Sequence, residues 1–304
     1  MPRDKKRRRS GQRAKPASPT PSGGTPPAPV RRRRGLVIGK MAVIAASVLL
    51  SVAAVATSLS LLRILGPSPP PEGPPRAAII DQLSLTVPNP DFAEAATRLL
   101  EQAGYAVEYY DGGKVTVNFY KDIPSRGFQL LLFRVHSGVS REVNLATGEV
   151  SQMEFVSLFT GEIFRQTLYL KEQQEQLVGA GRTPYDPDTT YFGIGPRFIK
   201  QSMRGEFKDS VIVLMGCDSL KTPTTAQALI DKGASAVVGW NKKVAAEHTD
   251  AATLQLLEEY VVKGLPLDEA VKNVSSLIGP DPYFGAEMLL LRDSARAVAL
   301  HGQK

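Results

Sequence analysis

Short apolar runs separated by amphipathic segments fill the chain from residue 77 onward. Most of these runs have the length of buried strands, and several are apolar at nearly every position, as in parallel strands that are covered on both faces. We predict strands at 77–80, 106–110, 114–120, 129–135, 211–215 and 235–240. The turn residues Asp111, Gly112 and Gly113 separate the second of these strands from the third.

The segments between the apolar runs contain helix start and stop signals. Residues 89–104 begin with Asn89, a favourable N-cap, continue with Pro90 and end at Gly104. Further helices are predicted at 224–233, 249–264 and 266–279, each of which ends in glycine. Alternating strands and helices predict an α/β fold with a doubly wound sheet and right-handed crossovers.

The middle of the chain departs from this alternation. Between 139 and 165, polar and apolar residues alternate around Gly148 and Gly161, which predicts a hairpin inserted in the loops at the top of the sheet. Residues 171–190 are polar and contain proline and glycine, so we predict a long surface loop there.

The N-terminal residues differ in composition from the rest. Residues 1–40 hold 13 of the 37 Lys and Arg residues but one of the 30 acidic residues. They are rich in Pro, Ser and Gly, with too little apolar surface to offset the entropy of ordering, so we predict a disordered basic tail. The remaining chain is mildly acidic, which argues against nucleic acid as its main partner. Nucleic acid stays an alternative partner for residues 1–40 alone.

An uncharged apolar stretch follows this tail. We predict a transmembrane helix at 41–63, because about 20 apolar residues cross the hydrocarbon core. The proline-rich residues 64–76 are predicted to form a semi-rigid linker to a domain at 77–304.

The charge around this stretch predicts its orientation. Basic residues precede the span, which places the N-terminus in the cytoplasm and the C-terminal domain outside. The sequence thus predicts a single-pass cell-membrane protein. The alternative is cleavage after Ala56, since Ala54-Val55-Ala56 fits a signal-peptidase site.

Two rare side chains end apolar runs. His136, one of three histidines, follows 129–135, and Cys217, the one cysteine, follows 211–215. The carboxyl ends of parallel strands meet at one sheet edge, so the two residues face each other if their strands are neighbours. An imidazole can take the proton of a thiol and leave a nucleophilic thiolate. Taken singly, each residue also fits a structural role, as a buried small residue or a hydrogen-bonded histidine.

These strand ends resemble a known family. The chain has VHSG at 135–138 and GCDS at 216–219, and then GASAVVGW and HTDAATLQLLEEYVVKGLPLDEAV. In this it is similar to the caspase-like (clan CD) cysteine peptidases, closest to the CHAT and gingipain-like branches. That family has a histidine after one strand and a cysteine after the next parallel strand. After the cysteine, the family continues with an acid, a Gly-Ala strand that ends in Trp, and an Asp-x-x-Thr helix. The matching residues in this chain are, in the same order, Asp218, Gly233-Ala234, Trp240 and Asp250 to Thr253.

The resemblance covers most of 77–280 and carries several implications. It implies a three-layer α/β/α sandwich with a mostly parallel sheet, in a membrane-anchored prokaryotic protein. It also implies a cysteine peptidase that hydrolyses polypeptide substrates, with Cys217 as nucleophile and His136 as base. The amides of Gly138 and Cys217 would bind the oxyanion, and Asp218 would bind a basic substrate side chain. No cofactor or metal is implied.

One departure from the family leads to a second hypothesis. Ser137 follows His136 directly, where the family has glycine. The alternative is therefore a catalytically inactive caspase-fold domain, a binding or scaffold module displayed outside the cell. Asp186 and Asp188 are further candidates for a substrate carboxylate. His248 and Asp250 form an H-x-D pair without a second cluster to complete a metal site.

Overall fold

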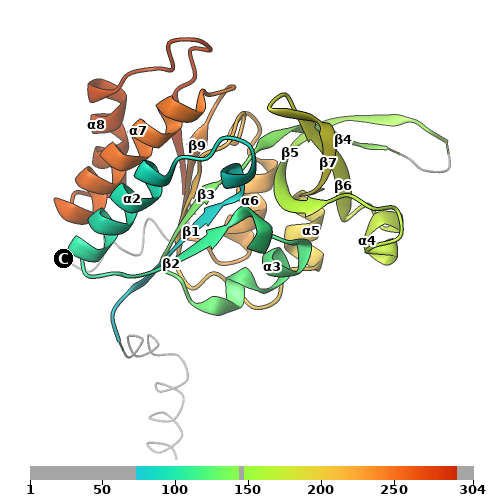
Figure 1. Cartoon of the computed structure of the whole chain (residues 1–304), viewed down its shortest axis with the longest axis horizontal. Coiled ribbons are helices and arrows are strands. Elements are labelled where there is room, and N and C mark those ends of the chain that lie inside the picture. Colours follow the sequence, from blue (N-terminus) through green and yellow to red (C-terminus); the bar gives the residue numbers. More distant parts are fainter. Residues whose placement is uncertain (1–72, 144–146, 293–304) are drawn as a thin grey trace, which may run out of the picture. The chain divides into compact units, whose positions relative to one another are not determined.

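A computed structural model describes residues 73–143 and 147–292 (Figure 1). The predicted tail at 1–40, the predicted membrane helix at 41–63 and most of the predicted linker lie outside these residues. Among the described residues, no helix combines the length and the apolar composition needed to cross a membrane.

A six-stranded sheet forms the centre of the domain, in the order β10-β9-β8-β3-β1-β2. All neighbouring strands run parallel except β10, which is antiparallel to β9. The strands are β1 (Arg76–Asp81), β2 (Ala106–Asp111), β3 (Leu130–Arg134), β8 (Val211–Leu214), β9 (Ala236–Trp240) and β10 (Met288–Arg292). The predicted α/β class and mostly parallel sheet are confirmed, whereas β10 was not predicted.

Helices cover both faces of this sheet (Figure 1). On one face lie α2 (Pro90–Gln102), α7 (Ala246–Leu257) and α8 (Leu267–Leu277), and on the other α3 (Val117–Asp122), α5 (Pro196–Gln201) and α6 (Thr224–Asp231). Successive strand residues alternate between the two cores, so Ala77 and Ile79 pack against the first group and Ala78 and Ile80 against the second. The described domain therefore has three layers.

The helix boundaries follow the signals in the sequence. Asn89 Oδ1 accepts a hydrogen bond from the Phe92 amide at 3.1 Å, and Pro90 is the first residue of α2. Gly104 follows the helix with a φ of 84°, which glycine adopts without strain. The prediction of this helix is confirmed at both ends.

The predicted strand at 114–120 is wrong. A short 3-10 helix at Gly112–Lys114 leads into α3, and Thr116 Oγ1 caps α3 by accepting from the Phe119 amide at 3.1 Å. The β-branched and aromatic residues favoured a strand, but the helix buries Phe119 and Tyr120 against the sheet. Tertiary burial and a local cap overrode strand propensity here.

A second, four-stranded antiparallel sheet stands at one edge of the domain, in the order β4-β5-β7-β6 (Figure 1). Its strands are β4 (Ser137–Val143), β5 (Val150–Ile163), β6 (Val178–Thr183) and β7 (Asp186–Ile194), with α4 (Leu170–Gln174) before β6. The predicted hairpin is confirmed as β4 and β5.

The predicted loop at 171–190 is wrong, because it contains α4, β6 and part of β7. Its glycines make strand propensity low, but they serve close packing. A Cβ at Gly181 would lie 2.5 Å from the Phe159 ring of β5, so only glycine leaves room for that ring.

Candidate functional site

His136 and Cys217 come to the same edge of the central sheet. β3 and β8 are parallel neighbours, and Phe133 is paired with Leu214. His136 and Cys217 each lie three residues beyond this pair, so they leave the sheet at matched positions. The structure thus brings together the two strand ends that the sequence singled out.

Ser137 joins these strand ends directly. Its hydroxyl donates a hydrogen bond to the carbonyl oxygen of Cys217 at 2.6 Å. The contact is close because residue 216 is glycine: a Cβ there would lie 2.3 Å from both Ser137 Oγ and the Val135 carbonyl oxygen. The serine that departs from the family pattern is therefore a link between the histidine and cysteine segments.

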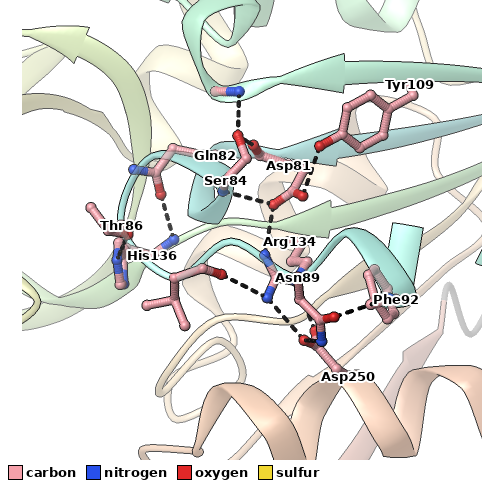
Figure 2. A network of polar contacts seen from close by, with 12 residues as sticks. Asp81, Gln82, Ser84, Thr86, Asn89, Phe92, Tyr109, Arg134, His136 and Asp250 are labelled. Carbon is pink, nitrogen blue, oxygen red and sulfur yellow. Dashed lines mark hydrogen bonds and ion pairs between the residues drawn. The ribbon is translucent and has the colours of Figure 1, made fainter. Parts of the chain in front are cut away.

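The imidazole of His136 is held by hydroxyl groups and an aromatic ring. Its Nε2 lies 2.8 Å from Thr86 Oγ1 and 3.3 Å from Thr183 Oγ1. Tyr185 stacks on the ring, with centroids 5.5 Å apart at an interplanar angle of 23°. The backbone amide of His136 donates to Gln82 Oε1 at 2.9 Å (Figure 2). These contacts fix both the ring and its backbone.

The environment of His136 favours the uncharged ring. Burial lowers the pKa of His136 to about 4, and the positive charge of Arg134 contributes to the lowering. Because Nε2 is occupied by hydroxyl oxygens, Nδ1 is the ring nitrogen without a hydrogen-bond partner in the described part of the chain. A neutral imidazole with a free nitrogen can accept a proton.

The thiol of Cys217 is half-buried and protonated at neutral pH. Burial raises its pKa, and the nearby carboxylate of Asp218 adds to the effect. The sulfur contacts the carbonyl oxygen of Val244 at 3.5 Å. Within residues 73–143 and 147–292, no hydrogen bond joins this thiol to the His136 ring. The site at rest has a neutral thiol and a neutral imidazole at neighbouring strand ends.

A buried charge network centred on Arg134, close to His136 in the chain, lies next to the histidine (Figure 2). Arg134 is fully buried and bonds Asp81 Oδ1 through Nη1 at 2.8 Å. Its Nε and Nη2 bind the two carboxylate oxygens of Asp250 at 2.8 and 2.9 Å. Such a bidentate pair is strong and directional, and it compensates charges that burial would otherwise penalise.

The same guanidinium holds the loop that contacts His136. Arg134 reaches Asp81, where the loop begins, and its Nη2 donates to the carbonyl oxygen of Val87 at 3.0 Å. Asp250 also accepts from the Asn89 amide group at 2.9 Å. The loop between these anchors carries Thr86, which lies against the His136 ring (Figure 2). The buried Arg134 therefore holds the loop on both sides of Thr86 and so positions the Thr86 hydroxyl.

The remaining predicted residues lie around the site in different ways. Asp218 follows Cys217 in a turn with a φ of 57°, and its amide donates to the Lys242 carbonyl oxygen. Gly138 lies in β4 opposite Ser157. Asp186 accepts a hydrogen bond from the Tyr191 hydroxyl at 2.7 Å, and Asp188 belongs to β7.

The H-x-D pair does not form a unit in the structure. Asp250 binds Arg134, whereas the His248 ring packs edge-on against Trp240, with centroids 5.4 Å apart. Among the described residues, no three His, Cys, Asp or Glu side chains are grouped so that they could hold a metal ion.

Sequence reasoning missed Thr86, Tyr185 and the Arg134 network. Arg134 had a detectable signal, because it is the one charge in the apolar run LLLFRV, where an unpaired charge would be costly. Thr86 and Tyr185 had none, because they reach His136 from distant parts of the chain.

No protein-family model and no curated protein matches this chain.

Proposed function

We propose that the domain is a caspase-like cysteine peptidase, with Cys217 as nucleophile and His136 as general base. The observation that supports this most is the matched position of the two residues beyond the paired strands β3 and β8. The hydroxyl contacts at Nε2 leave Nδ1 as the proton acceptor.

The reaction would begin with transfer of the thiol proton to His136 Nδ1 as Cys217 Sγ attacks the peptide carbonyl carbon. The tetrahedral oxyanion collapses, the amine leaves with the proton from the imidazolium, and a thioester remains on Cys217. Water then attacks the thioester with His136 again as base, which releases the acid and restores the thiol.

We assign the oxyanion donors to the amides of Ser137 and Cys217 rather than to Gly138. In an antiparallel ladder, successive residues turn their backbone groups alternately toward and away from the partner strand. The Phe159 amide donates to the His136 carbonyl oxygen, so Gly138 also faces β5 and Ser137 faces away from it. The Cys217 amide has no acceptor in the described part of the chain. Both amides are therefore available to an oxyanion that forms at Cys217.

Labelling of the full-length chain with a fluorescent peptidyl acyloxymethyl ketone tests this proposal. We expect covalent labelling that Cys217→Ala abolishes and His136→Gln slows by about 100-fold, the typical contribution of a general base. Cys217→Ser is the matched control for the integrity of the fold. Labelling no faster than that of free cysteine would refute the proposal.

We propose further that residues 41–63 anchor this domain outside the cell, with the basic tail in the cytoplasm. The charge on one side of the apolar stretch supports this orientation. Protease digestion of intact cells should remove the domain, and the mass of the mature chain should include residues 1–56. A mature N-terminus after Ala56 would show cleavage instead.

One observation favours a second function, a binding domain without catalysis. The thiol contacts the Val244 carbonyl oxygen, and burial keeps it protonated. If this function holds, a cross-linked partner should be recovered equally from wild type and Cys217→Ala, with no labelling by the ketone probe.

A further inference from the structure

The small sheet lines an open cavity of about 610 Å³ beside the His136 segment, a size typical of ligand sites. Its lining shows how it is bounded. The outer strands β4 and β6 contribute consecutive residues, 137–143 and 178–182, whereas β5 contributes alternate ones, Phe155, Ser157 and Phe159. The cavity therefore lies against one face of β5 and β7, the middle strands of the small sheet. It is bounded on either side by the free edges of β4 and β6.

These free edges face each other along their length. At one end His136 Nε2 lies 3.3 Å from Thr183 Oγ1, and at the other Gln176 Nε2 donates to the Val143 carbonyl oxygen. The chain runs from His136 to Val143 along the first edge and from Gln176 to Thr183 along the second, over the same number of residues. The two contacts show that the edges run antiparallel to each other, and within the described residues they form no ladder with each other.

One of the edges offers unpaired backbone groups to this space. Because Gly138 and Ser140 face β5 in the ladder, the alternation turns the amides and carbonyls of Val139 and Arg141 toward the free edge. Unpaired groups on an edge strand are a template for another extended chain.

The floor of the cavity has room for side chains. A Cβ at Gly138 or Gly179 would meet no heavy atom within 4 Å, so both glycines border open space. The Phe155 ring instead covers Gly195, where a Cβ would lie 2.6 Å from it. An added strand would place its inward side chains over Gly138 and Gly179.

We propose that this cavity binds one extended segment of a polypeptide substrate, which adds to β4 as a strand and closes the small sheet. The segment would leave the cavity beside His136, where β4 begins, and continue toward Cys217. This inference rests on the proposed peptidase function for the identity of the ligand, but the binding itself needs no thiol chemistry.

Strand addition has a backbone signature that can be measured without knowing the substrate. Random seven-residue peptides, the length of β4, would be selected on phage against the full-length Cys217→Ser chain. The best binder would then be N-methylated at each residue in turn. We expect losses of tenfold or more at alternate positions only. No binder, or losses without this alternation, would overturn the inference.

Two substitutions connect such binding to the cavity. Val139→Pro removes an outward amide but no bond of the ladder, and Val139→Ala keeps the amide while shortening the side chain. We expect the proline variant to bind at least tenfold more weakly than the alanine variant. Gly179→Leu, whose side chain would occupy the open space, should also weaken binding at least tenfold. Equal affinities in all three variants, each with a cooperative unfolding transition, would overturn the inference.

The outcomes separate the two proposals. Alternating N-methyl losses in a chain whose thiol never reacts with the ketone probe would support strand addition and refute the peptidase. A reactive thiol without peptide binding would support the peptidase and refute strand addition. If peptides bind only after removal of residues 293–304, the natural occupant is the chain's own end, and the assignment to a substrate is overturned.

Discussion

The two strand ends that form the candidate site are built very differently. At the end of β3, His136 contacts Thr86, Thr183 and Tyr185, and a buried network centred on Arg134 supports the loop that carries Thr86. At the end of β8, the Cys217 sulfur has one polar contact with the described part of the chain, the Val244 carbonyl oxygen at 3.5 Å.

This difference separates the parts of the site that are preorganised from those that can move. The imidazole is held in one orientation before any ligand binds, which lowers the cost of ordering the base during reaction. The thiol has only a long contact with the Val244 carbonyl oxygen among the described residues, so its side chain is the less constrained of the two. Ser137 joins the two ends through its hydrogen bond to the Cys217 carbonyl oxygen.

The largest effect should come from breaking the network behind His136. Arg134→Met leaves the carboxylates of Asp81 and Asp250 buried without their partner, which costs about 3–5 kcal/mol. We expect the free energy of unfolding in urea to fall by this amount. Arg98→Met is the matched control, because Arg98 is exposed and its ion pair within residues 73–143 and 147–292 is with Glu94 at 3.4 Å. Equal losses in both variants would show that the network does not stabilise the fold.

A second effect depends on pH and is confined to the histidine end. The pKa of His136 is about 4 when folded, against an ordinary value of 6.5, so the unfolded chain binds more protons between these values. Stability from this group is therefore complete above pH 6.5 and is lost as pH falls toward 4, by up to about 3 kcal/mol. In His136→Gln this part of the acid destabilisation should disappear. An unchanged pH profile would show that the ring is not buried as described.

The fold of the central sheet could be predicted because its signals are local. Asn89, Pro90 and Gly104 bound α2 by their own backbone preferences, and the apolar runs of β3 and β8 need no partner to be recognised. The hairpin β4–β5 of the small sheet could be predicted from its alternating pattern, but β6 and β7 were hidden. They contain glycine, which disfavours strands unless close packing requires it, as Phe159 does at Gly181.

The part of the candidate site that could be predicted is the placement of His136 and Cys217, because both residues follow the ends of strands. That His136 and Cys217 share an edge follows from parallel topology. That Thr86 orients the ring, or that Ser137 bonds the Cys217 carbonyl oxygen, depends on loop paths between distant residues. No pattern along the sequence specifies such contacts.

A smaller effect should follow from loosening the His136 ring alone. Thr86→Val removes the hydroxyl 2.8 Å from Nε2 and keeps the shape of the side chain. We expect the rate of ketone labelling at Cys217 to fall about tenfold, the equivalent of one hydrogen bond. Thr86→Ser retains the hydroxyl and should restore most of the rate. If serine fails to do so, packing of the methyl group and not the hydrogen bond positions the ring.

The smallest effect should come from separating the two strand ends. Ser137→Ala removes the hydrogen bond to the Cys217 carbonyl oxygen and should lower the free energy of unfolding by about 1 kcal/mol. Ser137→Thr keeps a hydroxyl at this position and serves as the control. If the link also sets the distance between base and nucleophile, labelling should slow in the alanine variant by more than its loss of stability explains. Unchanged labelling would mean that β3 and β8, paired up to Phe133 and Leu214, position the two residues unaided.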